Sequence, residues 1–365
     1  MAAGSPLVLL AAGGTGGHLF PAQALASALQ KRGITVDLAT DHRAAHFKFP
    51  ARAVHIIPSA TLRGRNPFAL ARTATLLTLG GIKAWVLLGR LRPGVVVGFG
   101  GYPSVPPLFA ATMRGVPSVL HEQNGVMGRA NRLLAPRVTA IATGFGALKN
   151  LDSRWQGKIT FTGNPVRSEV VAASAAPYLA PDAGAKLRLL VFGGSQGARV
   201  MAEVVPKAIE RIPAAQLVRL SIVQQARPED LAAVQGTYAQ LGVEAECAPF
   251  FSDLPARMAQ AHLVISRSGA STVAELSAIG RPSILVPLPN ALDQDQLANA
   301  GMLAEAGGAI RIEQRDFTPE RLASEIASLA ADSGRLVRMA QAAKSAGILD
   351  ASERLAELVM KVARR

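Results

Sequence analysis

The stretch that decides the fold is LVLLAAGGTGGHLFP, residues Leu7–Pro21. An apolar run of strand length leads into a cluster of four glycines, and a helical pattern over residues 22–30 follows at once. This order predicts a glycine turn between a strand and a helix, where backbone N–H groups and the helix dipole favour an anion such as a diphosphate. The dinucleotide pattern G-x-G-x-x-G does not fit, because Leu19 occupies the third glycine position. His18 beside the turn instead suggests proton transfer on a polar substrate.

The same pattern recurs in the second half of the chain, where residues 187–198 again combine an apolar run, Gly193-Gly194 and a helix start. Two such units in 365 residues agree with about 100–200 residues per domain. Strand-like runs alternate with helical stretches in both halves; examples are Gly94–Gly98, Val116–Leu120, Leu217–Val223, Leu263–Ser266 and Ser283–Leu288. We therefore expect an α/β fold of two Rossmann-like parallel-sheet domains that face each other across a cleft, with ligands at the carboxyl ends of the strands.

The expected domains are residues 1–165 and residues 166–339. A stretch rich in proline and small residues, 163–185, is typical of a linker between them. The end of the chain has a helical pattern, and we expect a helix at about 340–365 to pack back on the first domain. Its apolar face would carry Leu355, Leu358, Val359 and Val362.

Charge is distributed unevenly along the chain. The whole chain carries +14; residues 1–165 hold 18 Lys/Arg against 4 Asp/Glu, and residues 166–365 hold 21 of each. Nucleic acid, an anionic membrane surface or a pyrophosphate substrate would suit the basic half. Aromatic residues are scarce and no nucleic-acid motif occurs, so we expect no nucleic-acid partner.

A membrane surface suits residues 62–92 better, since basic side chains such as Arg63, Arg65 and Arg72 alternate there with leucines and Trp85. The alternative is that the apolar side chains face the core and the arginines face water. No segment convincingly spans a bilayer, because the uncharged run Pro93–Met113 contains four prolines. We expect no signal peptide, and the single cysteine of the chain excludes an intrachain disulfide.

Four short polar stretches follow predicted strands. They are Gly100–Ser104, His121–Asn124, Ser266–Thr272 and the segment from Asp293 to Asn299. Four polar side chains in a row are costly in a buried place unless a ligand or a hydrogen-bond network uses them. The third stretch opens a helix that ends at Gly280, so it forms a second N-terminal anion site with Glu275 one turn inside.

Taken together, these motifs resemble the MurG family of peptidoglycan N-acetylglucosaminyltransferases. The matching stretches, in family order, are Gly13–His18, Gly100–Tyr102, His121–Asn124, Gly163–Arg167, Gly193–Arg199 and Arg267–Ala270. The resemblance implies a GT-B glycosyltransferase without a cofactor or bound metal. It would transfer GlcNAc from UDP-GlcNAc to undecaprenyl-diphospho-MurNAc-pentapeptide (lipid I) with inversion, forming lipid II for the cell wall, cell shape and cell division. The enzyme would be peripheral on the cytoplasmic face of the inner membrane, with an anionic lipid surface and other proteins of cell-wall synthesis as partners.

The resemblance also assigns roles to residues. His18 and Glu122 are the two candidate bases for the acceptor hydroxyl, and Gly14 and Tyr102 would contact the acceptor. The donor site would be lined by Thr15, Gly16, Gly17, Asn124, Arg167, Ser195, Phe251, Ala270, Ser271, Thr272, Glu275 and Gln296.

One position departs from the family, which commonly has Gln-Gln or His-Gln where this chain has Asp295-Gln296. A sugar contact by residue 295 is therefore in doubt. The change also creates Asp293-Gln294-Asp295, which is similar to the Asp-x-Asp metal motif of other glycosyltransferases. Two further classes stay open at this point. They are a UDP-sugar epimerase, against which the basic first half argues, and a non-catalytic membrane-binding protein, against which His18, Glu122 and Glu275 argue.

Overall fold

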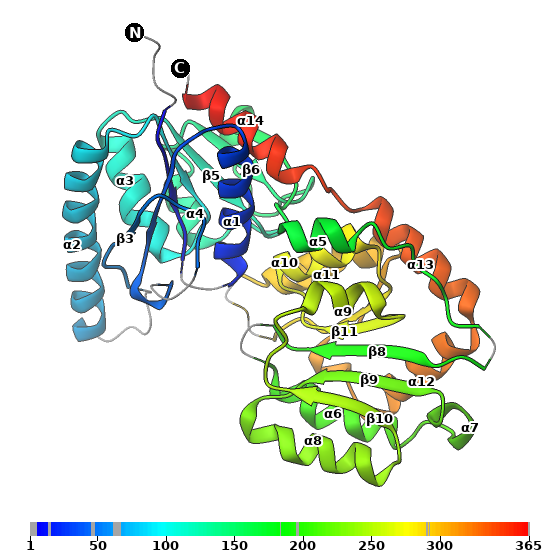
Figure 1. Ribbon diagram of the computed structural model, residues 1–365. Coiled ribbons are helices and arrows are strands. Elements are labelled where there is room, and N and C mark those ends of the chain that lie inside the picture. Colours follow the sequence, from blue (N-terminus) through cyan, green and yellow to red (C-terminus); the bar gives the residue numbers. More distant parts are fainter. Residues whose placement is uncertain are drawn as a thin grey trace. The chain divides into compact units, whose positions relative to one another are not determined.

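The computed structural model describes residues 6–13, 16–44, 48–60, 67–182, 184–194, 197–289, 291 and 293–363. The chain divides into two compact units (Figure 1). Unit 1 comprises Met1–Arg167 and Leu349–Arg365, and unit 2 comprises Ser168–Ile348.

Unit 1 is built on a seven-stranded sheet with the order β3-β2-β1-β4-β5-β6-β7, in which all neighbours are parallel. Successive residues of β1 point to opposite faces, so Val8 and Leu10 join one core cluster and Leu9 and Ala11 join the other. Both faces are therefore apolar, as in other parallel sheets covered on two sides. The strands are β1 (Val8–Ala11), β2 (Val36–Thr40), β3 (Val54–Ile56), β4 (Val95–Gly98), β5 (Ser118–Glu122), β6 (Ala140–Thr143) and β7 (Ile159–Phe161).

Helices cover both faces of this sheet (Figure 1). The first core cluster contains α1 (Gly16–Lys31) and the C-terminal helix α14 (Ala351–Ala363). The second contains α2 (Pro67–Leu91), α3 (Val105–Met113) and α4 (Arg129–Leu134). Three 3-10 turns complete the unit: η1 (His42–Ala44), η2 (Tyr102–Ser104) and η3 (Ser153–Lys158).

Unit 2 repeats the plan with a six-stranded parallel sheet of order β10-β9-β8-β11-β12-β13. Its strands are β8 (Leu187–Phe192), β9 (Leu220–Gln225), β10 (Glu244–Ala248), β11 (Leu263–Ser266), β12 (Ser283–Leu285) and β13 (Ala309–Arg311). A large apolar cluster joins the sheet to α6 (Arg199–Ile209), α8 (Pro228–Gln240), α12 (Pro319–Ala331) and α13 (Ser333–Ser345). The remaining elements are α5 (Ser168–Ala173), α7 (Ala214–Leu217), α9 (Leu254–Gln260), α10 (Ala270–Ile279), α11 (Asp295–Glu305) and η4 (Gln314–Asp316).

The expectation of two parallel sheets covered by helices is confirmed. The differences are local. His121 and Glu122, expected after a strand, are the last residues of β5. The linker expected at 163–185 contains the short helix α5, whose Val170 is buried. The run expected as a strand from residue 217 starts at Leu220, because residue 217 ends α7.

The C-terminal segment differs from the expected single helix over about 340–365. It forms two helices, and the boundary expected at residue 339 falls inside α13. The buried face of α13 packs in unit 2, and the Lys344 ammonium donates to the carbonyl oxygens of Ser174 and Ala278, both at 2.8 Å. The chain therefore enters unit 1 only at Leu349, and α14 packs there against α1.

Helix α2 also differs from expectation. Its stretch Ala71–Leu91 is long and apolar enough, by length and composition alone, to cross a membrane, and only 17% of its most apolar window is buried. It is the one such helix in the described part of the chain. The uncharged run Pro93–Met113, by contrast, folds into β4, η2 and α3.

Candidate active site

The glycine turn after β1 places His18 in the first turn of α1, where the side chain is half-buried. A Cβ atom added at Gly13 or at Gly101 would lie 3.2 Å from the His18 ring. Gly101 also has a φ of +71°, which side chains rarely adopt. Glycine at these positions lets the loops after β1 and β4 approach the imidazole from two directions. Gly14 and Thr15, the other residues predicted in this turn, lie outside the described residues.

The side chain of Arg167, which follows β7 in the chain, packs against the first turns of α1. Its guanidinium stacks on the Phe20 ring, with 4.1 Å between the Arg167 Cζ atom and the ring centroid. A Cβ at Gly16 would meet the same ring at 3.0 Å, so glycine leaves room for this packing. Gly17 is exposed and has open space where a Cβ would stand. The helix start therefore combines exposed backbone with a fixed cation.

Glu122 is the other candidate base, and hydrogen bonds occupy both of its carboxylate oxygens. It is 1% exposed, and one carboxylate oxygen accepts from the backbone N–H (3.0 Å) and the side-chain Nδ2 (3.1 Å) of Asn124. The other oxygen accepts from the Gly128 backbone N–H (2.9 Å) and from Asn131 Nδ2 (2.7 Å). Desolvation by burial raises the pKa of this carboxyl, and the four donors oppose that shift. Glu122 thus holds the loop of residues 124–128 and orients Asn124 and Asn131.

The neighbouring His121 is buried and neutral, because desolvation lowers its pKa to about 4. Its Nε2 lies 3.2 Å from the carbonyl oxygen of Gly163, so Nε2 carries the proton and donates it. Nδ1 then accepts from Gln123 Nε2 at 3.1 Å. Both ring nitrogens are consequently engaged, and His121 links β5 to the segment of Gly163.

Tyr102, predicted to contact the acceptor, begins η2 and is half-buried. It follows Gly100 and Gly101, both with positive φ. The turn is closed by the Ser104 hydroxyl, which donates to the carbonyl oxygen of Gly101 at 2.8 Å. Tyr102 and His18 therefore both lie beside the 100–101 turn.

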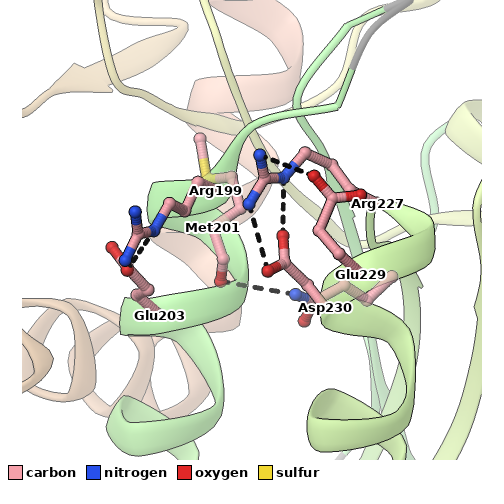
Figure 2. A network of polar contacts seen from close by, with 7 residues as sticks. Arg199, Met201, Glu203, Arg227, Glu229 and Asp230 are labelled. Carbon is pink, nitrogen blue, oxygen red and sulfur yellow. Dashed lines mark hydrogen bonds and ion pairs between the residues drawn. The ribbon is translucent and has the colours of Figure 1, made fainter.

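In unit 2 the second glycine turn follows β8. Gly194 and Gly197 have φ of +88° and +71°, and a Cβ at Gly193 would stand 2.2 Å from the Ala198 backbone nitrogen. Arg227 packs on this turn; its Cγ would lie 2.8 Å from a Cβ at Gly197. Its guanidinium pairs with Asp230 (2.6 Å) and Glu229 (2.9 Å) at the start of α8 (Figure 2). Ser195, predicted to contact the donor, lies outside the described residues.

The loop after β10 contains Phe251, which is buried while its neighbour Phe250 is exposed. The Arg257 guanidinium lies 4.4 Å from the Phe251 ring centroid and is held by Glu246 at 2.6 Å and by Asp253 at 2.8 Å. Stacking on one face and two ion pairs behind the cation fix this aromatic ring.

The start of α10 is the predicted second anion site. Residues 270–275 form its first turns, with Ser271 and Thr272 half-buried and Glu275 buried. Arg267, just before the helix, is buried and donates to the carbonyl oxygens of Val286 and Pro287 and to Gln314 Oε1. It therefore ties together the loops that follow β11, β12 and β13.

Gln296, predicted to contact the sugar, has its Oε1 atom engaged by the backbone N–H of Leu288 at 3.0 Å. Asp295 is the first residue of α11, and its carboxylate accepts from the backbone N–H of the next residue, Gln296, at 2.8 Å. Within the described ranges no group of three His, Cys, Asp or Glu side chains is placed to hold a metal ion.

Sequence reasoning missed two residues that organise this region, Asn131 and Gln225. Nothing in the sequence of α4 distinguishes Asn131 as a functional residue. Gln225 could have been predicted, because two glutamines end the apolar strand β9, just as polar residues 121–124 follow an apolar run.

Two family models match the chain. The glycosyltransferase family 28 N-terminal domain matches residues 8–143, and the family 28 C-terminal domain matches residues 188–355. A curated relative from Rhodopseudomonas palustris strain BisB18 is 60% identical over 361 residues, covering 98% of this chain and 96% of its own. It is named UDP-N-acetylglucosamine–N-acetylmuramyl-(pentapeptide) pyrophosphoryl-undecaprenol N-acetylglucosamine transferase. A relative of the same name from Bradyrhizobium sp. strain BTAi1 is 58% identical and covers both chains completely.

The chain belongs to the MurG family. The crystal structure of Acinetobacter baumannii MurG matches with a TM-score of 0.77 and 28% identity, covering 98% of this chain and 99% of that one. The calicheamicin glycosyltransferase CalG4 matches with a TM-score of 0.65 at 16% identity, which shows the shared fold alone. The resemblance drawn from the glycine turns is thus confirmed, and MurG membership makes the chain an N-acetylglucosaminyltransferase.

Proposed function

We propose that the chain transfers GlcNAc from UDP-GlcNAc to the 4-hydroxyl of the MurNAc residue of lipid I, with inversion, and so forms lipid II. The observation that carries this proposal is full-length identity of 58–60% to relatives named for that transfer. The hydroxyl oxygen attacks the sugar carbon C1, the bond from C1 to the UDP oxygen breaks, and a base takes the hydroxyl proton. One base in hydrogen-bond reach of the hydroxyl suffices for an inverting transfer.

His18 is the base in this proposal. Its side chain is half-buried at a helix start, beside the turn that carries Tyr102. Glu122 is the weaker candidate, because four donors already occupy its two oxygens and it is 1% exposed. A group without an accessible lone pair cannot take a proton from a substrate. Glu122 instead fixes the loop that presents Asn124.

The donor is assigned to unit 2. The backbone N–H groups of the first turn of α10 favour the departing diphosphate, since a helix N-terminus stabilises negative charge. Glu275, one turn inside the helix, is the residue to which we assign the hydrogen bonds from the ribose hydroxyls. The nucleobase is assigned to the loop of Phe251, whose ring is fixed by Arg257.

The inner-membrane surface is the proposed location, and the α2–α4 surface is the proposed contact. We define it as the exposed apolar side chains of α2, α3 and α4: Leu79, Ile82, Trp85, Val86, Phe109, Met113 and Leu133. Two arginines lie on its aromatic rings, Arg114 at 4.4 Å from the Trp85 centroid and Arg137 at 5.9 Å from that of Phe109. Apolar side chains flanked by cations suit the interface of an anionic bilayer, with the helix lying in its plane. Arg63 and Arg65 lie outside the described residues, and Arg72 is exposed on α2.

The test measures UDP release from UDP-GlcNAc with and without a water-soluble lipid I analogue. We expect release that depends on the analogue and a product with a new β-1,4 linkage. Interconversion of the sugar nucleotide without acceptor would instead indicate an epimerase, and binding without turnover would indicate a non-catalytic protein. His18→Gln is expected to lose more than 100-fold in kcat, within the range typical of removing a general base.

A further inference from the structure

Gln225 joins two loops at the carboxyl edge of the unit 2 sheet. It ends β9, which lies between β8 and β10, and its side chain is 7% exposed. Its Oε1 accepts from the backbone N–H of Gly193 in the glycine turn after β8, at 3.1 Å. Its Nε2 donates to the carbonyl oxygen of Pro249 in the loop after β10, also at 3.1 Å. One side-chain amide therefore bridges the loops that follow the two strands next to β9, namely β8 and β10.

The orientation of this amide is determined by its partners. Gly193 offers only a backbone N–H in this contact, so it needs the oxygen, and Pro249 offers only a carbonyl, so it needs the nitrogen. A flipped amide would lose both bonds. A glutamate would keep the bond to Gly193 and place a second acceptor against the Pro249 carbonyl.

Each of the two loops joined by Gln225 has a further contact of its own. The turn of Gly193 is closed tightly on Ala198, as the 2.2 Å approach of an added Cβ shows. The loop of Pro249 is held from its far side, where Arg257 stacks on Phe251 and pairs with Glu246 and Asp253. Gln225 bonds to one residue of each loop and so links the two segments.

We propose that Gln225 is a positioning residue for the donor nucleotide, because it links the nucleobase loop of Phe251 to the glycine turn of Gly193, the turn in which Ser195 is predicted to contact the donor. The inference rests on the proposed assignment of UDP-GlcNAc to unit 2. Gln225 acts through the two loops and does not itself contact the donor. Because both loops are assigned to one donor molecule, loss of Gln225 weakens donor binding and leaves acceptor binding unchanged.

The test compares Gln225→Met with a matched control, Gln224→Met. Gln224 precedes it in β9 but faces the core, where its Nε2 donates to the carbonyl oxygen of Met201 at 3.3 Å and its Oε1 accepts from the Tyr238 hydroxyl (Figure 2 shows Met201 at the start of α6). Both substitutions remove a buried amide of the same size from the same strand. We therefore expect similar losses in the free energy of unfolding. The variants differ in the partners that lose a hydrogen bond: Gly193 and Pro249 in one, Met201 and Tyr238 in the other.

Binding of UDP-GlcNAc and of uridine is measured by calorimetry, together with KM for donor and acceptor. Q225M is expected to weaken UDP-GlcNAc binding and raise the donor KM by about tenfold, as expected when buried hydrogen-bonding groups lose their partner. The acceptor KM stays unchanged. Q224M is expected to lower the melting temperature as much as Q225M does and to leave the UDP-GlcNAc affinity within about twofold.

Gln225→Glu provides the second variant. It retains the acceptor for Gly193, so its loss falls on the nucleobase loop, and uridine and UDP-GlcNAc are expected to weaken by the same factor. In Q225M the loss for UDP-GlcNAc exceeds that for uridine, because the glycine turn is released as well. Unchanged donor affinity in Q225M, or an equal loss in Q224M, would overturn the inference. If the wild-type chain binds UDP-GlcNAc but does not transfer the sugar to the acceptor, the proposed function fails while the binding comparison still decides the role of Gln225.

Discussion

His121 and Glu122 are adjacent residues of β5 whose burial shifts their pKa values in opposite directions. Desolvation lowers the pKa of His121 to about 4 and raises that of Glu122, because it disfavours the charged form of each. The imidazole is neutral with a defined tautomer, and the carboxylate is held by four donors. Both side chains are engaged by hydrogen bonds within unit 1. At the scale of residues, this polar motif therefore acts as a scaffold, and the base that we propose is His18.

The neutral His121 makes the stability of unit 1 depend on pH. Between pH 6.5 and about 4 the unfolded chain binds a proton at this residue and the folded unit does not. The free energy of unfolding therefore falls as pH is lowered through this window, by on the order of 3 kcal/mol at most. Both tryptophans, Trp85 and Trp155, lie in unit 1, so their fluorescence during urea unfolding reports this unit.

His121→Gln is expected to flatten the pH dependence of that transition. The control is His262→Gln in unit 2, whose pKa is also lowered to about 4 by burial and by the charges of Arg188 and Arg281. It should leave the tryptophan transition as steep in pH as in the wild type. An equal flattening by both variants would contradict the assignment to His121.

A further prediction concerns Glu275, the residue to which we assign the contact with the donor ribose. Glu275→Ala is expected to weaken UDP-GlcNAc and UDP binding alike, by about 1–3 kcal/mol, because the lost hydrogen bonds are to the ribose. Calorimetric titration with both ligands measures the effect. Ser277→Ala, on the same helix, removes only a hydroxyl that donates to the Val273 carbonyl and should leave both affinities unchanged. Normal binding by a folded Glu275→Ala protein would refute the ribose contact.

At the scale of elements, Arg281 holds helix ends together in unit 2. It is 1% exposed, and its guanidinium donates to the carbonyl oxygens of Met258, Ala259 and Gly280 at the C-termini of α9 and α10. Helix C-termini carry partial negative charge, so a cation there is stabilised without a carboxylate. Burial lowers the pKa of the guanidinium. One arginine thus supplies donors to the Ala259 and Gly280 carbonyls at the two helix ends and a second donor to the Met258 carbonyl.

Arg281→Met is expected to destabilise unit 2 by about 2–4 kcal/mol, because several buried carbonyls lose their donor at once. Hydrogen exchange resolved by peptide should accelerate in α9 and α10 and stay unchanged in β1 and β4 of unit 1. Arg321→Met is the control; Arg321 is 58% exposed in its pair with Glu325, and such surface pairs contribute about 0–1 kcal/mol. Equal exchange in the two variants would show that Arg281 does not hold these helix ends.

At the scale of the whole molecule, the excess positive charge and the exposed apolar side chains of the α2–α4 surface belong to the same unit. Ile82→Glu, on the α2–α4 surface, is expected to weaken binding to vesicles with anionic lipid by about tenfold, since it removes an exposed apolar side chain and adds a repelled charge. Added salt should weaken wild-type binding as it screens the basic residues. Flotation of the protein with vesicles measures both effects.

The matched control is Val218→Glu, which places the same charge on an even more exposed apolar residue of unit 2. It should leave vesicle binding unchanged. Both variants should turn over a water-soluble acceptor at the wild-type rate, because the role that we propose for the α2–α4 surface is docking and not chemistry. If Ile82→Glu binds vesicles normally and loses soluble turnover, the surface belongs to the acceptor site.

The sequence by itself determined the fold class and the edge at which the site residues lie. Apolar runs that end in glycines predicted β1 and β8, and the polar residues after each run predicted the carboxyl edge, because parallel strands all end there. It also placed His18 and the start of α10 at helix N-termini. These inferences depend only on neighbours along the chain, whose spacing the sequence states directly.

The role of each polar side chain, by contrast, depends on how distant segments fold together. The donors that occupy Glu122 come from Asn124, Gly128 and Asn131, and Gly163 sets the tautomer of His121 from 42 positions away. Gln225 bonds to residues of two other strands' loops, and Arg281 to the ends of two helices. Whether a lone pair is free or taken depends on which distant segments fold against it, and periodicity along one strand or helix carries no information about that.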